Sequence, residues 1–159
     1  DPIVLSHSMA LLKSVTMPPV YIHADARDTK TILVRAADTL DLNEPVGVLL
    51  IAVLHCIPAE DNPYRLVEGL MAAVPPGSFL AISHPAPDQE TEASRAQDSL
   101  TRSIGYPITF RTHDEVTRFF DGLYILEPGI VPVQQWRAVS ELDLDSPPTA
   151  MWAALGKKD

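Results

Sequence analysis

The stretch Val46–Pro58, VGVLLIAVLHCIP, decides the fold that this sequence predicts. It is apolar without interruption through Leu54 and becomes polar at His55. A short apolar run rich in Val, Leu and Ile is typical of a strand buried on both faces of a sheet, and such sheets are usually parallel and covered by helices. Ligands of these sheets lie outside the carboxyl ends of the strands, so we expect a site to begin within Ala52–Pro58.

The rest of the chain alternates between helix and strand patterns. Asp28 and Asn62-Pro63 are helix-start signals, and Thr112 with Glu115 has the spacing of a capping box. The expected helices cover residues 1–14, 28–37, 63–74, 87–101 and 112–120, and the expected strands cover 20–24, 46–54, 78–83, 123–126, 130–133 and 150–155. The helix faces expected to be buried are Leu66, Val67, Leu70, Met71 and Val74, and Val116, Phe119 and Phe120. This order predicts an α/β fold with a mostly parallel sheet, whose last two strands pair antiparallel at one edge.

Composition narrows the class of protein. The 159 residues carry a net charge of −9, which disfavours binding to nucleic acid. No apolar run is long enough to span a bilayer and no signal peptide opens the chain, so we expect a cytoplasmic protein that binds no membrane. The single Cys56 excludes an internal disulfide, and its apolar context is typical of a small buried side chain. The five histidines show no ligand spacing, so no metal site is expected.

Motifs along nearly the whole chain fit one joint pattern. The most specific are Asp1-Pro2-Ile3-Val4-Leu5, His23-Ala24-Asp25-Ala26-Arg27-Asp28 and the string from Asp41-Leu42 to His55. Further matches are Asp61, Pro63, Tyr64, Pro76-Gly77-Ser78, Ser83-His84, Arg118 to Gly122, Glu127-Pro128-Gly129, Pro132-Val133 and Trp136-Arg137. With this pattern the chain resembles the bacterial S-adenosyl methyltransferase family, class I enzymes long catalogued as a domain of unknown function. The resemblance implies a Rossmann-like sheet, mostly parallel with a final antiparallel strand.

Two parts of that family's cofactor site have no counterpart in this chain. One is the glycine-rich first turn, which embraces the methionine part of S-adenosylmethionine. The other is the acidic residue that holds the ribose, which would lie just before Asp1. We therefore expect residues 1–159 to form a single partial domain that lacks the first two strands. The chain is either a fragment of a longer polypeptide or a protein without cofactor binding of its own.

The resemblance also implies where the cofactor binds. Asp25 would accept the exocyclic amine of adenine, while Ala24 and Ala26 would let the ring approach. Read from the residues alone, Asp25 is better interpreted as a turn residue whose side chain bonds its own backbone, and only the resemblance favours the ligand role. Asp28 is interpreted as the N-cap of the next helix.

The end of the Val46–Pro58 stretch is the expected reaction zone. The resemblance places Ala52, Val53 and Leu54 beside the sulfonium of the cofactor. His55 is the candidate general base, because histidine titrates near neutral pH and can take a proton from a hydroxyl or an amine. Its alternative role is to bond backbone at the strand end. Methyl transfer often needs only positioning of the acceptor, since the sulfonium is already activated.

Tyr64 and His84 are the expected substrate-binding residues. Aromatic side chains such as Tyr64 more often serve packing, which is the alternative here. The pair Ser83-His84 does not indicate a hydrolase triad, because neighbouring residues on a strand point to opposite faces.

Two functions from different classes remain open at this level. The first is transfer of a methyl group from S-adenosylmethionine to a small-molecule acceptor, with the activity of the isolated chain left open. The second is a non-catalytic Rossmann-like module that binds a partner or forms a homodimer through a sheet edge left free by the absent strands. A nicotinamide-dependent oxidoreductase is disfavoured because the sequence has no G-x-G-x-x-G turn. The acceptor and its reacting atom are not specified by the sequence.

Overall fold

The structure is a computed structural model that describes residues 19–86, 108–138 and 150–159, with residues 3, 6, 7, 11, 96, 99, 100, 102 and 103. The two helices expected at residues 1–14 and 87–101 therefore lie mostly outside the described residues. The chain divides into two compact units, Asp1–Leu42 and Asn43–Asp159, and each is described by itself.

The first unit contains helix α2 (Thr29–Ala36). Its N-cap is Asp28, as predicted, because the Asp28 side chain accepts a hydrogen bond from the backbone N–H of Thr31 at 3.0 Å. The strand expected at residues 20–24 was wrong, since these residues form no strand and Val20 is 58% exposed. A β-branched run becomes a strand only where a neighbouring strand completes its hydrogen bonds.

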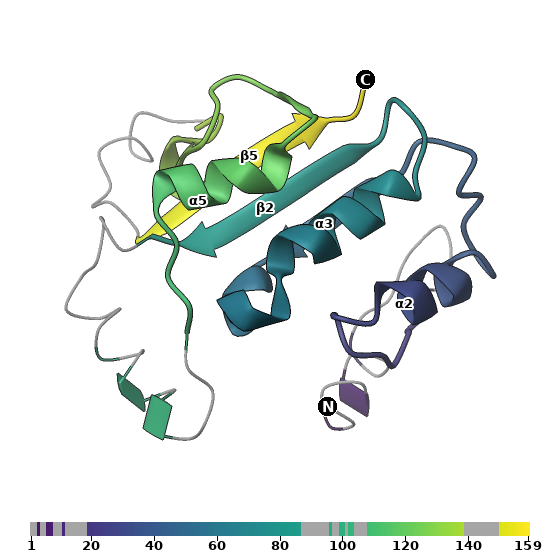
Figure 1. Ribbon diagram of the computed structural model, residues 1–159, viewed down its shortest axis with the longest axis horizontal. Coiled ribbons are helices and arrows are strands. Elements are labelled where there is room, and N and C mark those ends of the chain that lie inside the picture. Colours follow the sequence, from purple (N-terminus) through teal and green to yellow (C-terminus); the bar gives the residue numbers. More distant parts are fainter. Residues whose placement is uncertain are drawn as a thin grey trace. The chain divides into compact units, whose positions relative to one another are not determined.

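The second unit is built on a mixed sheet (Figure 1). Its strands are β1 (Gly47–Ile51), β2 (Phe79–Pro85), β3 (Tyr124–Ile125), β4 (Val131–Pro132) and β5 (Met151–Lys157). The order is β1-β2-β5-β3, and β4 also pairs with β5. β1 and β2 are parallel, whereas β5 is antiparallel to β2, β3 and β4. The predicted antiparallel pairing is confirmed, but β5 lies inside the sheet and not at its edge.

Helices cover one face of this sheet. Figure 1 shows α3 (Pro63–Ala72) and α5 (His113–Thr117) on the same side of the sheet, with α5 in front of β2 and β5, and η4 (Arg118–Phe120) follows α5 directly. The predicted caps are present at Asn62 and at Thr112, where the capping box with Glu115 is complete. All of the predicted buried positions are at most 8% exposed: Leu66, Val67, Leu70, Met71, Val74, Val116, Phe119 and Phe120. Three short 3-10 turns complete the unit, η1 (Leu54–Cys56), η2 (Ala59–Asp61) and η5 (Val133–Gln135).

β1 differs from the strand that the sequence predicts. It ends at Ile51 and not at Leu54, and it is not buried on both faces, since Leu49 is 67% and Ile51 53% exposed. Within the described residues β1 pairs only with β2, so it is an edge strand. The apolar composition of this stretch therefore predicted a strand correctly, but the prediction that both faces of the strand are buried was wrong.

Two close contacts fix the helices to the sheet. A Cβ added at Gly156 of β5 would lie 2.6 Å from the Phe120 ring, so only glycine lets η4 approach this closely. The Lys158 ammonium donates to the carbonyls of Met71 and Val74 at 2.9 and 2.8 Å, which satisfies the C-terminal end of α3. None of the helices in the described residues is both long and apolar enough to cross a bilayer.

Candidate functional site

The chain turns sharply where β1 ends. Ala52 has a positive φ of 52°, a conformation that costs a non-glycine residue roughly 1 kcal/mol or more. Its backbone N–H donates to the Ser83 hydroxyl at 3.0 Å and lies 3.3 Å from the Ser83 carbonyl. This turn leads directly into η1, which carries His55.

A pocket of about 150 Å³ opens beside this turn. Its lining is mostly apolar and comes from the ends of β1, β2 and β5 and from the segment before α5: Ala52, His55, Pro85, Ile108, Phe110, Ala150 and Met151. The structure thus brings two of the predicted site residues, Ala52 and His55, to one cavity at the carboxyl ends of the parallel strands. This is the place at which ligands of such sheets bind.

His55 is half-buried and electrically neutral at pH 7. Burial lowers the pKa of its imidazole, and the positive charge of Arg111 lowers it further. Its Nδ1 is buried and has no hydrogen-bond partner in the part of the chain that the structure describes. The backbone carbonyl of His55 accepts from the Thr109 N–H at 2.9 Å, so the backbone of this residue is held in place. A neutral imidazole with an unpaired nitrogen is able to accept a proton or a hydrogen bond.

Arg111 is a buried residue at this candidate site that the sequence reasoning missed. It is only 3% exposed, and its guanidinium lies beneath the turn that carries His55. Nη1 donates to the Leu54 carbonyl at 2.9 Å and to His84 Nε2 at 2.8 Å, and Nη2 donates to the Ile57 carbonyl at 2.8 Å. No local motif signals this role, because its partners lie 27 to 57 residues away in sequence.

His84 lies in the core behind the pocket. It is fully buried, and both ring nitrogens are bonded: Nδ1–H donates to the Pro85 carbonyl at 3.0 Å and Nε2 accepts from Arg111. Burial lowers the pKa of His84 to about 4, so the ring is neutral. In this arrangement His84 offers no free atom to a substrate, and its geometry favours a structural role over the predicted substrate contact.

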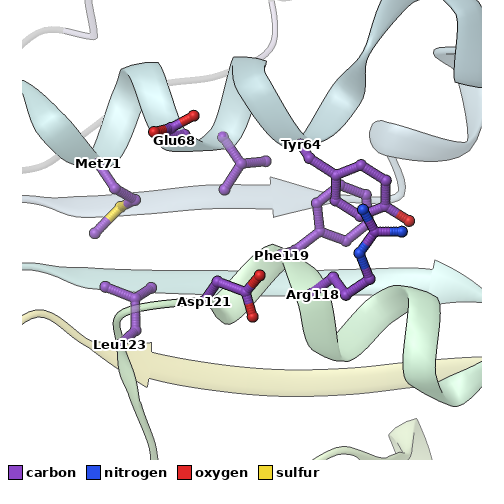
Figure 2. A pocket seen from close by; sticks show the side chains of 8 residues that line it. Tyr64, Glu68, Met71, Arg118, Phe119, Asp121 and Leu123 are labelled. Atoms are coloured by element: carbon purple, nitrogen blue, oxygen red, sulfur yellow. The ribbon is translucent and has the colours of Figure 1, made fainter.

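Tyr64 lines a different pocket, of about 270 Å³, between α3 and η4 (Figure 2). Its ring stacks on Phe119 with centroids 4.5 Å apart, and the Arg118 guanidinium lies 4.3 Å from the Tyr64 centroid. The structure therefore does not bring Tyr64 to the cavity that contains His55. Its neighbours there include Glu68, Met71 and Asp121, as Figure 2 shows.

The remaining residues of the turn point in different directions. The side chain of Leu54 is fully buried, so toward a ligand it offers only backbone. Val53 is half-buried. Cys56 is exposed, contrary to the burial that its apolar context predicted, because the turn of η1 carries it to the surface.

In the first unit, Asp25 forms a compact turn with Arg27. The Arg27 side chain donates to both carboxylate oxygens of Asp25, at 2.9 and 2.6 Å, and the Arg27 backbone N–H donates to Oδ1 at 2.9 Å. These hydrogen bonds hold the pKa of the Asp25 carboxyl well below its usual range. The backbone-bonded turn that the sequence left as an alternative is therefore present. The carboxylate is still 51% exposed, which leaves it open to a ligand, while Ala24 and Ala26 beside it are half-buried.

A parallel β1–β2 pair with helices between its strands, a final antiparallel strand, and a site at the carboxyl ends together define an α/β domain of the class I methyltransferase type. The comparison with protein families agrees. This chain belongs to the S-adenosyl methyltransferase family, whose sequence profile matches residues 1–159.

Solved structures show the same fold. A DUF574 family protein from Streptomyces avermitilis is 34% identical with a TM-score of 0.90, and the match covers 100% of this chain and 63% of that chain. A putative methyltransferase from Thermobifida fusca is 30% identical with a TM-score of 0.84, and the match covers 100% of this chain and 60% of that chain. OxaC in complex with SAH and oxaline shares the fold at 19% identity and a TM-score of 0.59, and the match covers 100% of this chain and 34% of that chain. The chain thus spans less than two thirds of these proteins. No curated protein matches it.

Proposed function

We propose that this chain forms the acceptor side of a methyl-transfer site, in which a small molecule with an aromatic hydroxyl is methylated from S-adenosylmethionine. The observation that carries the proposal is the position of His55. Its ring is neutral and lines an apolar cavity at the carboxyl ends of β1 and β2, and its buried Nδ1 has no hydrogen-bond partner among the described residues, in a chain of the S-adenosyl methyltransferase family.

The size of the cavity supports an acceptor of one ring. Drug-sized ligands occupy about 300 to 1,000 Å³, whereas an apolar cavity of about 150 Å³ binds a molecule as small as benzene. The pocket beside His55 measures about 150 Å³ and is lined by Ile108, Phe110 and Met151, among others. It therefore fits a single aromatic ring and is too small for the whole cofactor.

The residues proposed for the cofactor differ in how well they fit it. Asp25 fits, because its exposed carboxylate can accept the adenine amine, and the small Ala24 and Ala26 flank it. Ala52 fits as a small exposed side chain on the rim of the pocket, with Val53 next to it. Leu54 contributes backbone at most. When bound, S-adenosylmethionine presents a methyl group on a positively charged sulfur, and OxaC, which shares the fold, was solved with SAH.

The proposed chemistry needs one proton acceptor. His55 takes the proton from the acceptor hydroxyl, and the bound cofactor would supply the methyl group to that oxygen and leave as S-adenosylhomocysteine. The imidazolium then releases the proton to water. The apolar walls of the pocket exclude water and orient the ring, so that the hydroxyl faces the imidazole.

The test is methyl transfer from isotope-labelled S-adenosylmethionine to phenols, with cyclohexanol as the saturated comparison. We expect label on the phenols, and we expect His55→Gln to lower the rate by about 10²- to 10⁴-fold, the usual contribution of a general base. His113→Gln is the matched control, because His113 is exposed on α5 and lies outside the pocket. A folded chain that transfers no methyl group contradicts the proposal, and an unchanged rate in His55→Gln removes His55 as the base.

The edge of the sheet favours a second candidate, a homodimer. β1 pairs on one side only among the described residues, and it presents the apolar side chains of Leu49 and Ile51 to solvent. An exposed apolar edge strand is a template for pairing with another chain. A second copy of β1 would complete its hydrogen bonds and cover these two side chains.

A further inference from the structure

Arg111 connects three parts of the candidate site that are far apart in sequence. Its guanidinium bonds the carbonyls of Leu54 and Ile57, which stand on either side of His55 and Cys56. We propose that Arg111 is the positioning residue of this turn, which holds the His55 imidazole in its place at the ring-sized pocket. This inference rests on the proposed role of His55 as general base.

The geometry of the contact requires an arginine. A guanidinium is a rigid planar fork whose two terminal nitrogens can bond two acceptors at fixed separation, which the single ammonium of lysine cannot reproduce. Nη1 and Nη2 of Arg111 use this fork to bridge the two ends of the turn, and Nη1 also bonds His84 on β2. The turn is therefore tied to the sheet through one side chain.

The backbone next to Arg111 strengthens the same connection. Two residues earlier, the Thr109 N–H donates to the carbonyl of His55 at 2.9 Å. The N–H of Arg111 itself lies 3.5 Å from the Pro85 carbonyl at the end of β2. Ile108 and Phe110 of this segment line the pocket, so the segment that orients His55 also forms the wall of the cavity.

The buried charge is the second part of the argument. No carboxylate of the described residues lies within 4 Å of the Arg111 guanidinium, which is 3% exposed. Its compensation comes from two carbonyls, one imidazole and the face of Phe119, 5.5 Å away. A hydrogen bond with the Tyr64 side chain and the charge of Glu115 stabilise the guanidinium further. An apolar side chain of similar volume would avoid the cost of desolvation, but it would remove the donor to the Ile57 carbonyl and leave the Leu54 carbonyl with the Ile57 N–H alone. Arg111 therefore does more than fill space.

The charge also acts on the two histidines that face it. Arg111 contributes to the lowered pKa of His55 and of His84, after the larger effect of burial. The other titratable groups that act on His84 are His55, which lowers its pKa, and Glu115 of α5, which raises it. The rings of His55 and His84 meet edge to face with centroids 6.3 Å apart. Arg111 thus helps to keep the proposed base unprotonated.

The experiment compares Arg111→Met and Arg111→Lys with the wild-type chain. In Arg111→Met, NMR titration of the histidine ring protons should show the pKa of His55 rising toward its ordinary value. kcat should fall by about 10²-fold, the usual effect of misplacing a catalytic group by about 1 Å, with KM changed less than about threefold. Arg111→Lys keeps the positive charge but not the planar guanidinium. The pKa of His55 should therefore stay lowered, as in the wild type, while kcat stays low.

Lys158→Met is the matched control. Like Arg111, Lys158 donates to two backbone carbonyls from a partly buried position, but at the end of α3 and outside the pocket. It should lower stability without moving the pKa of His55 or kcat. Circular dichroism and denaturation confirm that each variant is folded.

The outcomes separate this inference from the function on which it rests. An unchanged His55 titration in folded Arg111→Met overturns the inference, as does full activity in Arg111→Lys. The NMR readout needs no methyl transfer, so it decides the role of Arg111 even if the wild-type chain proves inactive. An inactive wild-type chain contradicts the proposed function alone.

Discussion

At the scale of single residues, His84 shows how burial decides what a histidine does. The sequence placed it at the rim of the site because it follows Ser83 at the end of a strand pattern. In the structure it belongs to the face of β2 that the helices cover, and its ring packs 6.2 Å from that of Phe119. Alternation along a strand could have suggested this, since His84 shares the face of Leu80 and Ile82.

The neutral state of His84 predicts a pH-dependent stability. Its folded-state pKa of about 4 lies below the ordinary 6.5, because burial, together with the charges of Arg111 and His55, outweighs the bond to the Pro85 carbonyl and the charge of Glu115, which raise the pKa. Between these values the unfolded chain binds more protons, so falling pH favours unfolding. The contribution of His84 is constant above about pH 6.5 and decreases below it, by up to about 1.4 kcal/mol per pH unit.

Urea denaturation at pH steps from 7 to about 4 measures this dependence. His84→Gln keeps groups that can bond Pro85 and Arg111 but does not titrate, so its unfolding free energy should decline less steeply over this range. Val34→Gln, at an exposed position without a titratable group, should keep the wild-type slope. If His84→Gln and the wild type show the same slope, the ring is not held neutral in the folded chain.

At the scale of elements, local signals predicted most of the helices and strands. α2, α3 and α5 begin at Asp28, Asn62 and Thr112, where a short polar side chain caps the first turn. The buried face of α3 follows directly from its 3.6-residue period. Such features depend on residues three or four positions apart, so they can be predicted from a single sequence.

Features that depend on distant partners were harder to predict. The exposure of β1 depends on which strand lies beside it, and the absence of a strand near Val20 depends on whether a partner is available. Arg111 bonds Leu54 across 57 positions, and no periodicity links the two. That Ala52 and His55 lie at the cavity could be predicted because they follow an apolar strand, whereas nothing in the sequence indicated that Arg111 bonds their turn.

The edge of β1 has its own test. If a second copy pairs with β1, sedimentation velocity should show a concentration-dependent dimer. Leu49→Lys should shift it to monomer, because a charge on an edge strand opposes pairing. Val34→Lys, which changes a comparably exposed apolar residue on α2, should leave the dimer intact. A monomer at all concentrations in the wild type contradicts the dimer.

At the scale of the whole molecule, the family defines the fold more fully than it defines the activity. This chain matches the S-adenosyl methyltransferase profile from end to end, yet it spans 63% and 60% of its two relatives with solved structures. The central claim is that residues of this chain are sufficient to bind the cofactor.

The most direct measurement is calorimetric titration of the 159-residue chain with S-adenosylmethionine and S-adenosylhomocysteine. We predict saturable binding of both, weakened about tenfold in Asp25→Asn, since the loss of a charge-assisted hydrogen bond costs roughly 1.5 kcal/mol. Asp28→Asn is the control, because it removes a charge from the same turn while asparagine preserves the helix cap. No binding heat from a folded chain, or equal weakening by both substitutions, would contradict the account.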